Sequence, residues 1–417
     1  MIGALGAMLI VPAAASAATQ RYASPSGVDT APCTLAAPCD IATAITGAGS
    51  GDDVYLIANQ GNYSLSGGIS SPSGKTVHIH GFDGRPNLLF PSGGGLSLED
   101  GTADTLVIGA QGGATAFSLD TSNASADRIF VAQAGTGHPC YSNGGTLTNS
   151  ICWQGNTASN DLAIETDGAN TFRNDVAWNS GSGVGIRAFG RSGLNGNDTL
   201  INTIVRATGS GDHDLAANST GLESATFNVS YSNFGTTVAE GTASTDHFNT
   251  DSTDQSAMPQ LVNPSLGNFH ERQSSPTINA GITSSANGSL DLDGNPRTVG
   301  GKTDIGAYEL GTPSTSLPPT PSPPHGTTIT KSKIKKKKHS ARFSFKASGT
   351  VTGFQCALAK QKKGKHGKKK KKVKLVFRSC ASPKTYKHLK HGRYIFEVRA
   401  VNGAGVDPKP AVRKFKI

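Results

Sequence analysis

Two tryptophans and an arginine are the residues of this chain best suited to bind a sugar. Trp153, Trp178 and Arg206 each stand two positions after the end of a repeated T-[LF]-x-N-x-[IV] pattern. A flat aromatic ring beside a guanidinium can stack on a sugar ring. Because both tryptophans share the strand parity of Ile151 and Val176, packing of their rings in a core is the competing interpretation.

A carboxylate and a cation form the second candidate group. When the strands that contain Ile164 and Ile186 are aligned, Glu165 lies next to Arg187 on the neighbouring strand. Further polar residues stand near the starts of such strands: Asp161, Asp212, His213 and Asp214. The group could hydrogen-bond a glycan, and a weak surface ion pair beside solvated turn acids is the alternative.

One acidic segment has the composition of a calcium loop. In Asp291-x-Asp293-Gly294-Asn295 the glycine is fourth rather than sixth, and Lys302 occupies the twelfth position, where an EF-hand has glutamate. A polar turn is therefore predicted. The chain also lacks a C-x-x-C zinc pattern, a G-x-S-x-G elbow, a P-loop and a dinucleotide fingerprint. We expect no metal and no cofactor, and no motif supports calcium.

Two lysine runs could bind an anionic polymer by releasing its counterions. They are Lys335, Lys336, Lys337 and Lys338, and then Lys368, Lys369, Lys370, Lys371 and Lys372. The second run lies between Cys356 and Cys380, where a hairpin loop is expected. Neither run has interleaved aromatics that would stack on bases, so an anionic envelope polymer is the expected partner rather than nucleic acid. A merely solubilising loop is the alternative.

The charge of the 417-residue chain is divided between its two ends. Residues 327–417 hold 28 Lys and Arg against two acids, whereas residues 1–326 hold 11 against 27. The net charge of +10 is therefore the sum of −16 and +26. With 52 glycines and only 6% aromatic residues, the composition favours strands and turns over helices. No apolar run reaches the roughly 18 residues that would span a membrane.

The N-terminus and the cysteines indicate export. Residues 1–17 are predicted to be a signal peptide, because the apolar stretch Ile2–Val11 is followed by a proline and by the small residues Ala15-Ser16-Ala17. An unprocessed apolar tail is the alternative. The cysteines form three local pairs, which we expect to be disulfides: Cys33 with Cys39, Cys140 with Cys152, and Cys356 with Cys380. Such bonds suit a secreted or cell-surface protein.

An internal repeat indicates the fold. The pattern T-[LF]-x-N-x-[IV] places Asn149, Asn174 and Asn202 at separations of 25 and 28 residues. Each unit has room for further strands but not for a crossover helix, so successive units must stack as coils of a parallel β-helix. Residues 54–265 correspond to about eight coils at roughly 26 residues each. The asparagines are expected on the inward side or at a corner, where stacked amides bond one another.

The coils before this repeat are also predicted to contain strands. Short β-rich runs at 54–57, 76–79, 105–108 and 128–131 are separated by Gly, Asn, Ser and Asp. The apolar spacing of Ile41, Ala44 and Ile45 predicts one short helix before them. This helix and the first disulfide are expected to cap the open edge of the first coil.

Several segments resemble known families. Tyr22-Ala-Ser-Pro-Ser-Gly27, Gly51-Asp-Asp-Val-Tyr-Leu56 and Val77-His-Ile-His-Gly81 resemble the first coils of secreted pectin-lyase-like right-handed parallel β-helix proteins. Ser275-Pro-Thr-Ile-Asn-Ala-Gly281 and Asp304-Ile-Gly-Ala-Tyr-Glu309 resemble the choice-of-anchor Q segment that ends many bacterial exported β-helices. The resemblance covers about residues 20–310 and implies extracellular carbohydrate as the target. It yields a capped β-helix domain at residues 18–310.

Catalysis has less support than binding. The polygalacturonase set of Asn-x-Asp, Asp-Asp, Gly-His-Gly and Arg-x-Lys is not assembled, since Asp52-Asp53 precedes the first coil strand and Gly137-His138 is followed by Pro139. The preferred hypothesis is therefore a surface protein that binds carbohydrate and attaches to the envelope through its basic part. The alternative is a polysaccharide lyase or glycoside hydrolase whose catalytic residues are unknown.

The last part of the chain is predicted to be a separate β-sandwich. Residues 311–326 are rich in Pro, Ser and Thr and form the expected linker. Beyond it, runs such as 343–345, 354–356, 373–377, 394–398 and 415–417 alternate as half-buried strands. The segment from Leu389 to Gly405 resembles the later strands of fibronectin type III or immunoglobulin-like modules, with Tyr394 as their corner tyrosine. Residues 327–417 would thus complete an all-β chain.

Overall fold

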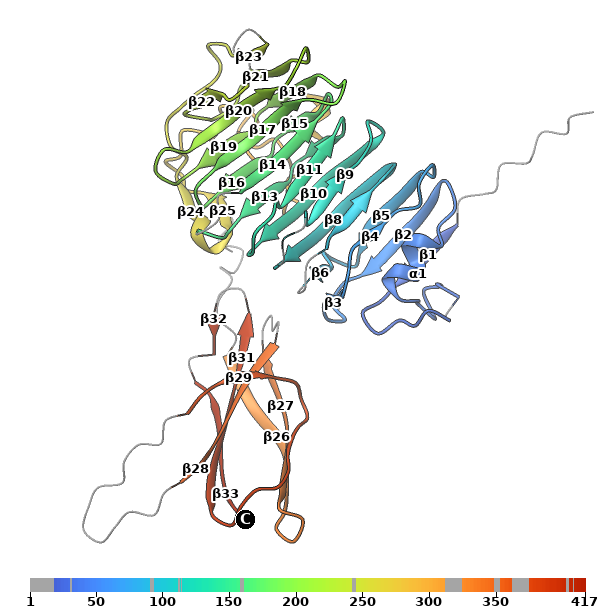
Figure 1. Cartoon of the computed structure of the whole chain (residues 1–417), viewed down its shortest axis with the longest axis vertical. Helices are drawn as coiled ribbons and strands as arrows, with labels where there is room; N and C mark the ends of the chain where they lie inside the picture. The colour runs from blue at the N-terminus through green and yellow to red at the C-terminus, as the bar shows by residue number, and fades with distance from the viewer. Residues whose placement is uncertain are drawn as a thin grey trace, which may run out of the picture. The chain divides into compact units, whose positions relative to one another are not determined.

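The structure of the chain is a computed structural model, shown in Figure 1. It describes residues 19–30, 32–90, 94–111, 113, 115–157, 161–241, 245–311, 325–348, 353–361, 375–402, 405–407 and 409–417. The predicted signal peptide, most of the predicted linker and the run Lys368–Lys372 lie outside these residues. The described residues form two compact units, one on each side of the linker.

The first unit is a parallel β-solenoid of about 8 turns, which confirms the predicted fold class. Its coils follow one another from the blue to the green part of Figure 1. An eight-stranded sheet in the order β22-β20-β17-β14-β11-β9-β7-β4 forms one wall. Its strands are β4 (Ile69–Ser70), β7 (Leu96–Leu98), β9 (Phe117–Leu119), β11 (Cys140–Asn143), β14 (Leu162–Asp167), β17 (Val184–Gly190), β20 (His213–Ser219) and β22 (Thr237–Ala239).

A 15-stranded sheet forms the other walls and bends at a corner in each coil. Its first line of strands is β1 (Gln20–Ala23), β2 (Asp52–Ile57), β5 (Val77–Phe82), β8 (Gly101–Ala110), β10 (Ala124–Gln133), β12 (Thr146–Thr148), β15 (Thr171–Arg173), β18 (Gly196–Ile201), β21 (Ala225–Ser230) and β23 (Asp246–Asn249). The strands β3 (Tyr63–Ser64), β6 (Asn87–Phe90), β13 (Ile151–Gln154), β16 (Val176–Asn179) and β19 (Ile204–Ala207) complete it.

Apolar rows along the stack make the core. Parallel pairing places Ile164, Ile186 and Leu215 in one register, and all three side chains are buried. Coils stack about 4.8 Å apart, so each inward residue packs on its equivalents above and below. Each such side chain contributes roughly 1.5–3 kcal/mol through burial. The repeat therefore builds a continuous core without any helix inside it.

The corners use a left-handed backbone conformation. Asn149, Asn174 and Asn202 have φ angles of 50°, 56° and 53°, a region that asparagine tolerates better than most residues. The amide of Asn174 donates to the side-chain oxygen of Asn149 at 3.1 Å, and that of Asn202 donates to Asn174 at 2.9 Å. Stacked amides at the corner are therefore confirmed.

A short helix covers the first coil. Helix α1 (Ile41–Thr46) buries Ile41, Ala44 and Ile45 and lies at the blue end of the stack beside β1 and β2 (Figure 1). Asp40 caps its N-terminus by accepting a hydrogen bond from the backbone of Thr43 at 2.9 Å. The helix and the cap thus agree with the sequence pattern.

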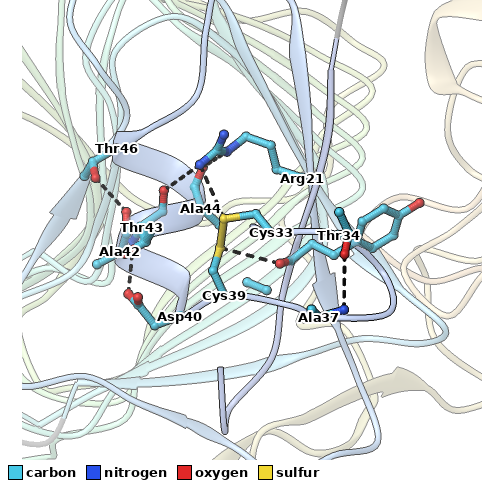
Figure 2. The surroundings of a disulfide bond; sticks show 12 residues. Arg21, Cys33, Thr34, Ala37, Cys39, Asp40, Ala42, Thr43, Ala44 and Thr46 are labelled. Atoms are coloured by element: carbon cyan, nitrogen blue, oxygen red, sulfur yellow. Dashed lines mark hydrogen bonds between the residues drawn. A yellow bond between two sulfur atoms is a disulfide. The ribbon is translucent and has the colours of Figure 1, made fainter. Parts of the chain in front are cut away.

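The first disulfide and an arginine hold this cap in place (Figure 2). The Cys33–Cys39 bond closes the loop that leads into α1. From β1, Arg21 donates to the carbonyl oxygens of Thr43 and Ala44 at 3.0 and 2.8 Å and to the sulfur of Cys33 at 3.4 Å. A cation at the C-terminal carbonyls of a helix is favourable, so Arg21 joins helix, loop and first strand. All three predicted disulfides are confirmed.

The last segment of the first unit packs on the outside of the coils. It contains β24 (Leu261–Asn263), the 3-10 helix η1 (Pro264–Leu266), β25 (Asn268–Glu271) and the 3-10 helix η2 (Ser285–Asn287). We call residues 261–310 the closing segment. Its Phe269 and Ile305 are buried in a cluster with Ile151, Val176 and Ile204 of the coils. The cluster is separate from the core inside the coils.

The second unit is built from two antiparallel sheets. One contains β26 (His325–Lys335), β27 (Ser340–Ser348) and β30 (Lys384–Tyr386); the other contains β28 (Gly353–Lys360), β29 (Arg378–Cys380), β31 (Arg393–Asn402), β32 (Gly405–Val406) and β33 (Ala411–Lys416). Phe343 of the first sheet stacks on Phe396 of the second at 4.1 Å between ring centroids, so the sheets share one core. The hydroxyl of Tyr394 donates to the carbonyl of Lys390 at 2.7 Å, which is the hydrogen bond of a tyrosine corner.

The prediction of one strand in this unit is wrong. Residues 375–377, the described part of the predicted strand 373–377, have no regular structure, and the strand β29 begins only at Arg378. Within the described part of the chain, no helix is long and apolar enough to cross a membrane.

Candidate functional site

The two tryptophans lie beneath the closing segment. Phe269 packs edge-on against Trp153 and Trp178, with ring centroids 5.8 and 5.6 Å away, and Trp178 is only 6% exposed. The core interpretation of these rings is therefore the one that the packing supports. A sugar could stack on Trp178 only if the closing segment moved away.

Arg206 is also buried, at 3% exposure. Its guanidinium pairs with Asp214 at 3.0 Å, and it donates to the carbonyl oxygens of Ser256 and Ala257 at 3.0 and 3.2 Å. Asp214 in turn accepts from the backbone of Ala207 at 2.7 Å. Arg206 thus orders a loop against the coil, and its charge is not presented at the surface.

Glu165 lies on the outer face of the eight-stranded sheet and contacts a histidine and an arginine. The distance from its carboxylate to Nε2 of His138 is 2.9 Å and to the guanidinium of Arg191 is 2.7 Å. Arg191 also binds Asp167 through Nε at 2.8 Å, and Tyr141 donates its hydroxyl to Asp167 at 2.9 Å. We call these five side chains, together with Arg187, the charged row.

Arg187 occupies the predicted register beside Glu165 but binds a different partner. The strands β14 and β17 pair Glu165 with Arg187. The Arg187 guanidinium nevertheless lies 2.7 Å from Glu240, while Glu165 is taken by Arg191. Arg191 also lies over the ring of Phe189 at 3.9 Å from its centroid. Both candidate residues are thus at the surface, in two neighbouring ion pairs.

The electrostatics of the charged row favour binding over acid catalysis. The hydrogen bond from His138, with help from Arg191, lowers the pKa of Glu165 to about 2 despite its burial. A glycoside hydrolase needs a carboxyl group that still holds a proton near neutral pH beside the substrate. Glu165 is ionised there and acts as a fixed hydrogen-bond acceptor.

Carboxyl groups with a raised pKa lie inside the fold. Burial raises the pKa of Asp198 to about 7, that of Glu271 to about 8 and that of Glu309 to about 7. Asp198 is fully buried and accepts from Thr166 at 2.7 Å. All three carboxyl groups accept hydrogen bonds from other residues of the protein, and all three are buried.

The acids at the strand starts order loops. Asp161 accepts a hydrogen bond from the backbone of Gly137 at 2.8 Å, and Asp212 accepts one from Gly183 at 3.0 Å. In each case the acid and the glycine belong to successive coils. These contacts give the strand-start acids a structural role.

A second group of side chains lies on the outer face of the first coils. Strand register places Tyr22 beside Tyr55, Tyr55 beside His80, and His80 beside Asp104. The rings of Tyr22 and Tyr55 stack at 5.1 Å between centroids, and those of Tyr55 and His80 at 5.2 Å. With the neighbouring Asp53, these residues form what we call the ring stack. All five are partly exposed.

Two carboxylates hold the histidine of the ring stack. His80 contacts Asp104 through Nδ1 at 2.5 Å and Asp53 through Nε2 at 3.2 Å. The hydrogen bond with Asp104 is the main cause of the raised pKa of His80. Burial acts to raise the pKa of Asp104, but hydrogen bonds from His80 and Thr105 outweigh it and the pKa is lowered. The ring stack thus combines apolar rings with carboxylate acceptors, as sugar sites do.

The first lysine run lies at a turn of the second unit. Lys335 ends β26, and Lys336, Lys337 and Lys338 form the exposed turn to β27. The backbone of Lys338 closes the turn on Lys335 at 3.1 Å. The run is therefore exposed to solvent. The second run, Lys368–Lys372, lies outside the described residues.

The acidic segment of the closing region is a polar turn. Asp291 accepts from the backbone of Asn295 at 2.7 Å, and Asp293 pairs with His270 at 2.7 Å. These contacts occupy the carboxylates within the protein. No group of three or more His, Cys, Asp or Glu side chains is placed to hold a metal ion in the described ranges.

The ring stack and most of the charged row were not identified from the sequence. Tyr22, Tyr55 and His80 stand in segments that resembled the first coils, and aligning alternate residues of those segments would have shown the ladder. Arg191 and His138 gave no such signal. They lie in connecting segments outside the strands, and their side chains contact Glu165 from there. Only a repeat position can be aligned from sequence.

The fold places the chain among parallel β-solenoids, in a form compatible with the pectin-lyase-like β-helices. Comparison with known proteins finds no family model and no curated protein that matches the chain. The class of the protein therefore rests on its architecture.

Proposed function

We propose that the protein is exported and binds extracellular carbohydrate on the outer face of its first coils. The observation that carries this proposal is the ring stack, where Tyr22, Tyr55 and His80 lie beside Asp53 and Asp104 on a rigid sheet. Tyrosine rings offer apolar contact to a sugar, and the carboxylates accept its hydroxyl hydrogens. Three disulfides agree with an oxidising compartment.

The charged row offers a second glycan contact on the other wall of the coils. Glu165 and Asp167 are held as acceptors by Arg191, and Arg187 supplies donors next to them. Fixed ions of both signs can bind an extended polar chain at several points. The ring of Phe189 beside this row is covered by the Arg191 guanidinium, so we rank the row second.

The basic second unit is proposed to attach the protein to an anionic envelope polymer. Its net positive charge and the exposed turn at Lys335–Lys338 support this role. The tyrosine corner of Tyr394 supports the likeness to immunoglobulin or fibronectin type III modules. The closing segment retains its likeness to the choice-of-anchor Q segment, and its packing on the coils suits an end piece of an exported β-helix.

An array of polysaccharides incubated with the purified protein tests the glycan proposal. Y55V should weaken binding to the best glycan about three- to tenfold, because it removes one aromatic contact. F248V changes a partly exposed ring of β23, outside both candidate contacts, and serves as the matched control. Equal losses in both variants, or none in either, would exclude the ring stack as the site. Unsaturated or reducing products in the same assay would instead support the lyase or hydrolase alternative.

A further inference from the structure

One end of the second unit contains a hollow lined by basic side chains. The turn between β26 and β27 and the segment between β30 and β31 border an open depression of about 490 Å³. Six titratable residues line this space: Lys337, Lys338, His339, His388, Lys390 and His391. We call it the basic hollow. Lys337 and Lys338 belong to the predicted polymer-binding turn, but Lys390 and the three histidines were not part of that prediction.

The two walls of the basic hollow are fixed to each other by backbone hydrogen bonds. Leu389 donates from its backbone to the carbonyl of His339 at 2.9 Å, and its own carbonyl lies 2.9 Å from Nδ1 of the His339 ring. The His339 and His391 rings meet edge to face with centroids 4.7 Å apart. Gly392 forms two further backbone bonds with Ile417, at 3.1 and 3.0 Å. The basic hollow is thus formed without any ion pair.

No carboxylate side chain neutralises this charge. Residues 327–417 contain only two acids, Glu397 and Asp407. Glu397 lies within β31 in register with Val412, and Asp407 accepts hydrogen bonds from the backbones of Thr327 and Lys409, both at 2.8 Å. The other charged side chains on the packed elements are basic: Lys335, Lys336, Lys387, Arg393 and Lys416. Within the second unit, a bound anion would therefore meet no side chain of its own sign.

We infer that the basic hollow binds phosphate groups of an anionic polymer and does so more tightly in mildly acidic solution. The lysines supply charge at every physiological pH, whereas an imidazole near a phosphate gains its proton as the pH falls. Three histidines and three lysines line the hollow, so its positive charge can only increase as the pH falls. The inference rests on the proposed attachment function and names its site, its ligand chemistry and its pH response.

The lining favours a polyol phosphate over nucleic acid. No Phe, Tyr or Trp lines the hollow, so bases could stack only on imidazole rings, of which His339 and His391 pack against each other. A phosphodiester polymer with a small polyol unit needs only charge and space. It carries one anion per repeat, which several basic groups can engage at once.

Binding of poly(glycerol phosphate) to the full-length protein tests the inference. Affinity is measured at about pH 5.5 and about pH 8.0 at one ionic strength, and we expect it to be about tenfold tighter at the lower pH. H388N/H391Q should remove most of this pH response, because it removes two of the three imidazoles. Asparagine is chosen at position 388 because it tolerates the φ of 56° there. K337S/K338S should weaken binding at both pH values. K346S/K409S removes the same charge from exposed positions outside the hollow and is the control.

The outcomes separate the hollow from the attachment function as a whole. Equal wild-type affinity at both pH values, or equal losses in K337S/K338S and K346S/K409S, would overturn the inference while leaving attachment intact. Absence of binding to any polyanion at either pH would overturn both. Tighter binding of a single-stranded DNA of equal charge would replace the polyol phosphate with nucleic acid. Melting temperatures of the variants confirm that each remains folded.

Discussion

The side-chain amide of Asn202 donates a hydrogen bond to the side-chain oxygen of Asn174 across 2.9 Å, although the residues are 28 positions apart. The same ladder also holds the closing segment. Asn202 donates to the carbonyl of Ile282 at 2.9 Å and accepts from its backbone at 2.7 Å, while Asn149 donates to the carbonyl of Asn287 at 3.0 Å. The corner asparagines therefore serve both the turn of each coil and the attachment of residues 261–310.

Asn174, in the middle of the ladder, should be sensitive to substitution. N174A removes the amide contacts with Asn149 and Asn202 and places alanine at a φ of 56°, so we expect a loss of about 2–4 kcal/mol in the free energy of unfolding. N174G keeps the backbone conformation and should lose about 1 kcal/mol less. Chemical denaturation measures both. Equal losses in the two variants would show that the left-handed backbone costs nothing here.

Phe269 should fix the closing segment to the coils. It is 1% exposed and contacts both tryptophans of the chain, so F269A should cost about 3–5 kcal/mol. Because the chain has only 2 tryptophans, their fluorescence reports this interface directly. We expect a red shift and greater access of a soluble quencher. L222A, at a side chain that is 99% exposed, is the control and should leave both readouts unchanged.

The extent of prediction from sequence depended on whether a feature repeats. The asparagine spacing predicted the stacked coils, and the local cysteine pairs predicted the disulfides. The alignment of Ile164 with Ile186 placed Glu165 beside Arg187. These features depend on periodicity or on short separations. They require no knowledge of how distant segments meet.

The orientation of Trp153 shows where periodicity fails. If side chains alternated between the two faces without interruption from Leu147 to Trp153, Trp153 would lie on the inner side, where Leu147 lies. The left-handed corner at Asn149 resets the alternation, so that Cys152 faces the core inside the coils while Ile151 joins the cluster beneath the closing segment. A single φ of 50° thus reverses the faces of the following strand. The docking of the closing segment has no repeat to reveal it.

His80 should make stability depend on pH. Its pKa is raised in the folded protein, so its contribution is complete below its ordinary pKa of 6.5 and is lost as the pH rises through the raised value. The pKa of Asp104 is lowered, so its contribution is present above 3.8 and is lost as the pH falls through the lowered value. The pair should therefore stabilise the fold most between these two ordinary values.

Thermal unfolding across this range checks the pair. The decline of stability above pH 6.5 should be smaller in H80Q than in the parent protein. H247Q replaces an exposed histidine and should retain the full decline. If H80Q and the parent protein give parallel profiles, the contact between His80 and Asp104 does not stabilise the fold.

The disulfide between Cys140 and Cys152 should stabilise the middle coils. It joins β11 of one sheet to β13 of the other, and both side chains are buried. The loop of 12 residues predicts a loss of about 3 kcal/mol when both cysteines are replaced by alanine. The bond between Cys33 and Cys39 closes a loop of only 6 residues. Replacing these two cysteines by alanine should therefore cost less stability. Peptide mapping without reductant verifies the pairing, and a larger loss at the shorter loop would contradict the loop-length argument.

The affinity of the two lysine runs for an anionic polymer should depend on salt, whereas lysines of the acidic unit should not contribute to this dependence. If both runs contact an anionic polymer, the affinity of the full-length protein should fall steeply with salt, by a slope of roughly 0.7 for each lysine that releases a counterion. Replacing Lys335–Lys338 or Lys368–Lys372 with serine should each reduce that slope, because each replacement removes lysines that would release counterions. The melting temperature should remain unchanged in both variants. Serine at Lys75 and Lys302 of the first unit is the control, because those lysines belong to the acidic part of the chain. An unchanged slope in both lysine-run variants would mean that the runs only keep the protein soluble, and the attachment function would have to be abandoned.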